Sequence, residues 1–202
     1  MPNPVIKSPP YREYVTLIDN DGNELAIGAA GGLSADIATI AAGENIIGKL
    51  GFPDIVVTVT PTVDTSAYAA SDLLFVSTEI PSATRVNGGT CILQSVVILD
   101  KADQGVPITL VFSNANANFG APNSAPSPSD AAAAAVIGHV AIVAEDYVDL
   151  GASKVAYAVG FGALMQAGAG TTSIYVAGIN GTGTPTYGAA SDLVFQFGFL
   201  RA

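Results

Sequence analysis

The chain has 202 residues, of which 50% are hydrophobic and only 12% are charged, and its formal net charge is −10. This composition supports a real core and excludes disorder over the whole chain. The seven lysine and arginine residues form no basic stripe, so we exclude nucleic acid and anionic membranes as partners of the isolated chain. The low charge has two explanations: a surface covered by other molecules, including copies of this chain, or a surface rich in small residues.

The amino-terminal sequence favours an extended arm. Residues 1–12 contain four prolines, which remove backbone donors and favour an open path. The arm would lie on another surface, and a disordered terminus is the alternative. Residues 14–18 and 24–27 predict a small hairpin around an Asp-Gly turn. We therefore divide the chain into an arm with this hairpin, residues 1–52, and a main domain, residues 53–202.

The start of the chain also bears on where the protein is made. Met1 is followed by Pro-Asn-Pro, without the basic and apolar regions of a signal peptide. No apolar run reaches the roughly 18 residues of a membrane-spanning helix. We expect synthesis in a cytoplasm. Cys91, the single cysteine, lies in an apolar run and is expected to be a small buried side chain.

The main domain reads as a series of strands. Residues 54–60 are rich in β-branched side chains and end at Pro61, and residues 73–76 form the next strand. In the run 90–100 both alternating faces are mostly apolar, which predicts a central strand covered on both sides. A polar loop ending in Gly105 then leads to the strand 106–112. The two strands and this loop predict a hairpin.

A loop, one helix and further strands follow. Residues 113–130 are too polar and broken for an element, and form either a contact loop or a mobile one. Ser129 or Asp130 caps a predicted helix over 131–137, which Gly138 ends. The remaining strands are predicted at 139–144, 153–159, 162–167, 172–179 and 192–200, and the last one turns Leu193, Phe195, Phe197 and Phe199 toward the core. The pattern predicts an all-β fold, an antiparallel sandwich or jelly roll with an extended amino-terminal arm and one short helix.

Two segments of the main domain are similar to each other. Tyr-Ala-Ala-Ser-Asp-Leu-Leu-Phe at 68–75 matches Tyr-Gly-Ala-Ala-Ser-Asp-Leu-Val-Phe at 187–195. The aspartate can accept a hydrogen bond from nearby backbone where each strand begins. The similarity indicates either two independent turns of the same chemistry or two equivalent strands in paired sheets.

Candidate chemistry is sparse. Asp19, Asp21, Asn23 and Glu24 could offer oxygens to Ca²⁺, but their spacing departs from the EF-hand loop, so we interpret them as a turn. Glu145, Asp146 and Asp149 are interpreted as a solvated turn in the same way. His139 and Cys91 lie in apolar runs without a catalytic signature, and a metal site at His139 would need its copies to cluster, as at the threefold axis of an oligomer. We assign no catalytic residue, cofactor or metal ligand, and predict that the protein is not an enzyme.

Four stretches of the main domain carry a resemblance to a protein family. These are residues 59–68, 87–90, 97–105 and 147–151, with the sequences VTPTVDTSAY, NGGT, VILDKADQG and YVDLG. The segment from Asp54 to Leu200, about three quarters of the chain, resembles virion structural proteins of tailed bacteriophages, among them head decoration or cement proteins. The stretches are turns and strands, so the resemblance implies a family without fixing the role within it.

The resemblance implies a capsid decoration protein that binds the major capsid protein on the virion surface and forms a homotrimer. The arm residues expected to contact the capsid are Pro4, Val5, Ile6, Pro9, Pro10, Tyr11 and Arg12. One alternative is a tail or fibre component that contacts the host surface, with the loop 113–130 as its candidate contact. Another is a virion enzyme that hydrolyses sugars, which the absence of tryptophan disfavours.

Overall fold

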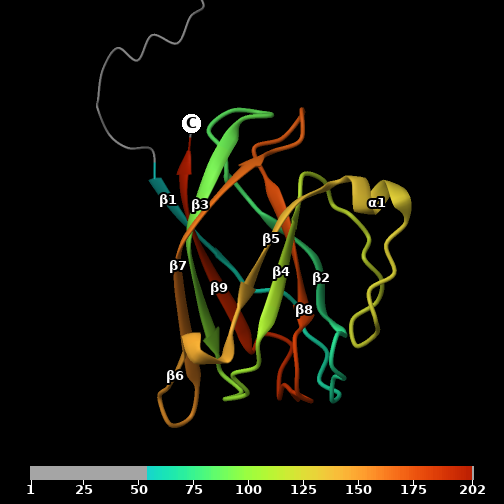
Figure 1. Ribbon diagram of the computed structural model, residues 1–202, viewed down its shortest axis with the longest axis vertical. Helices are drawn as coiled ribbons and strands as arrows, with labels where there is room; N and C mark the ends of the chain where they lie inside the picture. Colours follow the sequence, from blue (N-terminus) through green and yellow to red (C-terminus); the bar gives the residue numbers. More distant parts are fainter. Residues whose placement is uncertain (1–53, 202) are drawn as a thin grey trace, which may run out of the picture. The chain divides into compact units, whose positions relative to one another are not determined.

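The computed structural model describes residues 54–201 of the chain (Figure 1). The predicted arm, its hairpin and the seven predicted capsid-contact residues therefore lie outside the described residues. The elements are strands β1 (Asp54–Val59), β2 (Leu73–Ile80), β3 (Thr90–Asp100) and β4 (Ile108–Ser113), helix α1 (Asp130–Ala134), strand β5 (Val136–Ile142), the 3₁₀ turn η1 (Ala144–Asp146), and strands β6 (Tyr147–Asp149), β7 (Lys154–Gln166), β8 (Ile174–Asn180) and β9 (Leu193–Arg201).

Two antiparallel sheets form the described domain, as the sequence predicts. One sheet has the strand order β1-β9-β3-β7-β6 and the other β2-β8-β4-β5. Figure 1 shows the two sheets facing each other, with α1 beside the four-stranded sheet and β6 at one end of the five-stranded sheet. The fold is an all-β sandwich, and the predicted class is confirmed.

The core between the sheets centres on the aromatic side chains of β9. Phe195, Phe197 and Phe199 are at most 1% exposed and follow one another along the strand. They meet the opposite sheet through Phe75 on β2 and Phe112 on β4, with ring centroids 5.3 and 5.9 Å apart. Alternation in a strand places every second residue on one face, so the prediction that these phenylalanines are core is confirmed.

The predicted hairpin over 90–112 is wrong. β3 pairs with β7 and β9, whereas β4 pairs with β5 and β8, so the chain crosses from one sheet to the other between them. The buried carboxylate of Asp100 accepts hydrogen bonds from the backbone N–H groups of Ala102 and Gly105, at 3.0 and 2.8 Å. These bonds, with Gly105 at φ +60°, shape a loop that turns the chain away from β3.

Two other predicted boundaries need correction. Helix α1 is capped by the Ser129 side chain, as predicted, but ends at Ala134, and Val136 and Ile137 belong to β5. β-branched side chains favour the strand once the sheet offers a partner. The two strands predicted at 153–159 and 162–167 are one strand, β7, in which Gly160 and Gly162 adopt positive φ and absorb an irregularity in the pairing with β3.

The two similar segments form equivalent structures in opposite sheets. In each, an aspartate carboxylate accepts a hydrogen bond from a backbone N–H three residues earlier, at 2.8 Å: Asp72 from Ala69 and Asp192 from Ala189. The preceding tyrosines, Tyr68 and Tyr187, meet edge to face. Strand β1 precedes the first segment and strand β8 precedes the second. Each of these strands pairs with the strand that follows the other segment: β1 with β9, and β8 with β2. The interpretation as two equivalent strands in paired sheets is confirmed.

Candidate functional site

The most unusual surface of the described domain is the outward face of the five-stranded sheet. Its side chains alternate with the core side chains along each strand. They are largely apolar: Val56 on β1, Ile92, Val97 and Leu99 on β3, Val148 on β6, Val155, Tyr157, Val159 and Leu164 on β7, and Val194 and Leu200 on β9. We call this set the open face.

The strand register makes the open face continuous. Leu164, Ile92 and Leu200 lie opposite one another across β7, β3 and β9, and Val148, Val155, Leu99 and Val194 form a second row. Val56, Leu164 and Tyr157 are 67%, 67% and 63% exposed. Side chains opposite one another in a sheet are about 5 Å apart, so the rows merge into one apolar surface.

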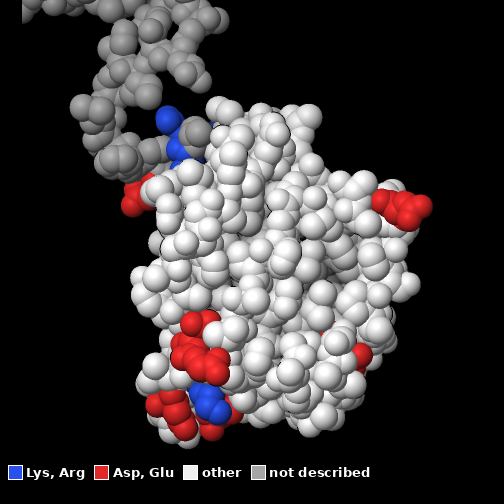
Figure 2. All heavy atoms as spheres, viewed as in Figure 1, with Lys and Arg blue, Asp and Glu red and all other residues white. Residues whose placement is uncertain are grey.

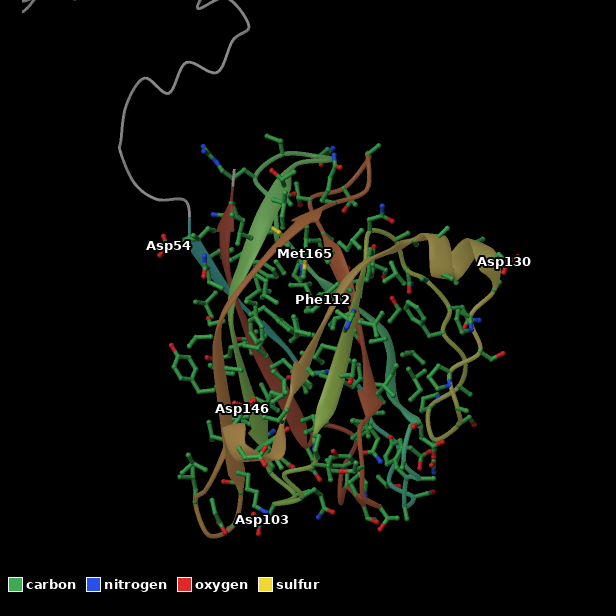
Figure 3. The ribbon with its side chains drawn as sticks, in the orientation of Figure 1. Asp54, Asp103, Phe112, Asp130, Asp146 and Met165 are labelled. Carbon is green, nitrogen blue, oxygen red and sulfur yellow. The ribbon has the colours of Figure 1, made fainter. Side chains whose placement is uncertain are left out.

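Few polar groups interrupt this surface. Thr58, Ser95 and Gln196 lie within it and are uncharged. Asp54, opposite Leu200 at the end of β1, is the charged residue at its margin. Figure 3 shows Asp54 at the corner where the described chain begins. The sequence predicts that the strand β3 is covered on both sides. Its core side is covered by the opposite sheet, whereas its other side belongs to the open face.

The outward face of the four-stranded sheet is partly covered by another segment of the chain. The long loop after β4 and helix α1 lie over its outward face, where Phe119, Ala117 and Ala132 are buried against Leu73 and Ala177. Backbone hydrogen bonds join Leu73 to Ser124 and to Asn123, both at 2.9 Å. The loop predicted as a contact or mobile segment thus packs on the part of the sheet formed by β2 and β8, while Val136 and His139 on β5 stay exposed.

Charged side chains lie mainly at the ends of the sandwich. In the view of Figure 2 most of the surface is uncharged, and acidic side chains gather near β6. Figure 3 labels Asp103 and Asp146 at this end and Asp130 at the far end beside α1. Lys154 lies 3.5 Å from the carboxylate of Asp103 and donates to its backbone carbonyl at 3.1 Å. Exposed acidic side chains within the strands include Asp54 at the start of β1 and Glu79 near the end of β2.

The predicted acidic turn is confirmed only in its first part: Glu145 and Asp146 lie in η1, whereas Asp149 ends strand β6 opposite Lys154. Asp146 accepts a hydrogen bond from the Val143 N–H at 2.9 Å, which caps η1, and Asp149 accepts one from the Gly151 N–H at 2.7 Å. Within residues 54–201 no group of three or more histidine, cysteine and acidic side chains is placed to hold a metal ion. The candidate calcium residues at 19–24 lie outside the described residues.

His139 and Cys91 occupy different sheets and different environments. His139 is exposed on β5, opposite Val111, while Cys91 is 1% exposed and faces the core from β3. The structure does not bring the two side chains together. Burial raises the pKa of the Cys91 thiol to about 11. The expectation of a small buried side chain is confirmed.

We expect Cys91 to resist thiol reagents in the native protein. The thiolate is the reactive form, and at pH 8 a pKa of about 11 leaves only about one part in a thousand ionised, in a side chain that reagents cannot reach. Native protein treated with an aromatic disulfide reagent at pH 8 should react at least about a hundredfold more slowly than unfolded protein in guanidinium chloride. Equal rates in both states would contradict the buried placement of Cys91.

Other buried ionisable groups lie between the sheets. Burial raises the pKa of Asp100 and of the Tyr147 and Tyr187 phenols, and the carboxylate of Asp100 adds to the effect on both tyrosines. Tyr187 is only 1% exposed. Asp100 and Tyr187 are buried in the core and Tyr147 packs against it partly buried, so we assign these groups to the core and not to a site.

A shallow depression of about 310 Å³ lies elsewhere, between β2 and the loop after β4. It is lined by Val76, Ser77, Asn116, Ala117 and Asn118. Its walls hold hydroxyl, amide and aliphatic groups and no ionisable side chain. Its lining therefore offers no acid or base that could activate the Ser77 hydroxyl.

Comparison with known proteins gives no family. No family model matches the sequence, and no curated protein matches it. Among solved structures, the chain is similar at 14% identity and a TM-score of 0.16 to "Structure of infectious bursal disease virus Gx strain", covering 73% of this chain and 37% of that one. At this TM-score the likeness carries no argument. Within residues 54–201 no helix has the length and apolar character needed to cross a membrane.

The residues of the open face were not assigned to a site from the sequence. The available signal was the run 90–100, whose two alternating faces are both apolar. That signal indicates a second covered surface but does not say what covers it. The other strands of the open face are β1, β9, β7 and β6. Only the tertiary structure places them in one sheet with β3.

Proposed function

We propose that this protein is a non-enzymatic structural protein of a bacteriophage virion, and specifically a decoration or cement protein of the capsid. It is made in the host cytoplasm and binds the major capsid protein on the head surface. The open face is the observation that carries this proposal, because a broad, uncharged, apolar surface suits contacts between the protein subunits of an assembly, copies of this chain included. The resemblance in the four stretches of the main domain supports it.

The mechanism is binding without chemistry. A protein that binds the assembled shell, and not its separated subunits, stabilises the shell by mass action. Each bound copy would bridge neighbouring capsid subunits and oppose the outward pressure of packaged DNA. The predicted arm, with Val5, Ile6 and Tyr11, would add apolar contacts on the capsid protein.

The direct test is to mix purified full-length protein with phage capsids that lack it. We expect saturable binding over the whole head, measured by co-sedimentation and by electron microscopy of labelled particles. Protein that ignores capsids but binds host cells, or labels only the tail, would replace this proposal with the tail or fibre alternative. Turnover of host polysaccharide would instead support the enzyme.

Deleting residues 1–12 is expected to weaken capsid binding by about tenfold or more, the equivalent of about 1.4 kcal/mol. The prolines limit the entropy that the arm loses on docking, and its apolar residues supply buried surface. Binding isotherms on capsids measure the effect. As a control, a Gly/Ser sequence of equal length in place of residues 2–12 should behave like the deletion.

Thermal unfolding of the sandwich should be unchanged in both variants. A truncated protein that coats capsids with wild-type affinity would show that residues 1–12 do not form the contact.

A further inference from the structure

We infer that the open face is the surface through which copies of this chain associate, so that Tyr157, Val159 and Val97 of one copy are buried against the same face of another. The inference rests on the proposed function for the place where the copies meet, the capsid surface. It adds the surface, the residues and the kind of contact that hold the copies together.

Charge is the first reason for choosing a second copy as the occupant. The chain carries a formal charge of −10, so two copies repel each other wherever their acidic ends approach. The open face holds no charged side chain away from the Asp54 margin, and the acidic residues near β6 lie at one end of the sandwich. The open face is therefore a surface on which an acidic protein can meet itself without placing like charges together.

The polar residues of the open face are also suited to self-contact. Thr58, Ser95 and Gln196 each carry both a donor and an acceptor group in the side chain. Across a twofold axis a patch meets its own copy, so such groups can pair with each other, whereas carboxylates or ammonium groups could not. Tyr157, with a phenol on a large apolar ring, belongs to a type enriched at interfaces.

The size of the open face agrees with a stable interface. The sheet has five strands about 4.8 Å apart, which gives a width of roughly 20 Å. The nine residues of β9, at about 3.3 Å each, give a length of roughly 30 Å, so the face covers about 600 Å² in projection. The accessible area of a corrugated surface exceeds its projection. A standard interface takes about 800 Å² from each partner, and the largest apolar patch on a typical monomer is about 300–600 Å².

The covered sheet supplies a comparison within the same molecule. The outward face of the four-stranded sheet is partly shielded by the loop after β4 and by α1, which bury Phe119 and Ala132. Tyr157, Val159 and Leu164 of the five-stranded sheet stay more than half exposed. Among residues 54–201 no segment covers this surface, and an apolar strand surface of this size left in water favours aggregation, which a specific contact would prevent.

The test compares two matched substitutions in the full-length protein. Val159→Glu places a carboxylate in the open face at a side chain that is 57% exposed, and Val136→Glu makes the same change on β5 of the other sheet, at a side chain that is 38% exposed. Light scattering and sedimentation equilibrium over a range of concentrations give the mass. We expect the wild type and Val136→Glu to have a mass of at least twice 20.3 kDa, the mass of one chain.

Val159→Glu should raise the dissociation constant of the oligomer by roughly a hundredfold or more, because a carboxylate without a partner is buried at the contact. Tyr157→Glu should do the same, and circular dichroism shows whether each variant is folded. A monomeric wild type, or equal effects of Val159→Glu and Val136→Glu in folded proteins, would overturn the inference.

These outcomes are separable from those of the capsid experiment. A wild-type monomer that coats capsids would leave the proposed function standing and remove the self-contact. An oligomer dispersed by Val159→Glu that ignores capsids would keep the self-contact and remove the proposed function. Both measurements use the same protein, and neither depends on the other's result.

Discussion

Replacing Phe197 with alanine is expected to lower the free energy of unfolding by about 3–5 kcal/mol. Phe197 is fully buried at the middle of β9, stacks between Phe195 and Phe199, and meets the ring of Phe112 on the opposite sheet. The substitution removes contacts to both sheets and leaves a cavity that the surrounding rings can fill only in part. Since domains of this size are stable by about 5–15 kcal/mol, the loss is a large share of the total.

Chemical denaturation at a fixed protein concentration measures this loss, since association would make stability depend on concentration. Phe197→Leu is the graded control: it keeps most of the volume, and we expect it to cost about 1–1.5 kcal/mol. If both variants unfolded at the wild-type denaturant concentration, Phe197 would not occupy the centre of the core.

Replacing Gly178 with alanine is expected to cost about 3 kcal/mol, at the upper end of the range for overpacking. Gly178 lies in β8 opposite Phe75, and a Cβ atom there would approach the ring atoms Cε1 and Cζ at 2.2 and 2.6 Å. Phe75 has no room to move away, because it is fully buried and its ring packs on Phe195. The backbone of β8 or the packing between the sheets must shift instead.

Gly138 offers a matched control in the same sheet. A Cβ atom at Gly138 in β5 would meet no atom within 4 Å, so Gly138→Ala should change the free energy of unfolding by less than about 0.5 kcal/mol. Denaturation curves of the two variants, recorded side by side, measure the difference. Similar midpoints would show that Phe75 does not lie against β8.

Several features of the fold could be predicted from local sequence. Alternating phenylalanines in 193–199 indicate the core face of β9, and the Ser-Asp-Ala run indicates a capped helix start. The ends of elements were less predictable. Gly138 marks a helix stop by propensity, yet the chain leaves the helix at Ala134, because Val136 and Ile137 pair with β4. Pairing with a distant strand outweighs local preference, and local sequence does not contain it.

The connection between β3 and β4 shows the same limit. Two apolar runs joined by a glycine-containing loop predict a hairpin, but such a pattern does not specify which sheet the second run joins. Here the buried Asp100 accepts the loop's backbone N–H groups, and β4 inserts between β8 and β5. The similar segments at 68–75 and 187–195 show the same limit. Their similarity can be seen in the sequence, but the exchange of partner strands between them cannot.

By itself the sequence determined the all-β class, the buried phenylalanines of β9, the burial of Cys91 and a charge distribution without a basic patch. These follow from side-chain chemistry and from the two-residue period of a strand, which are local. Only the tertiary structure decided which strands share a sheet, and hence that apolar residues from β1, β9, β3, β7 and β6 form one open face while the loop after β4 covers part of the other. The physical reason is that strand pairing joins residues far apart in the chain, so a surface built across strands exists only after the sheet has formed.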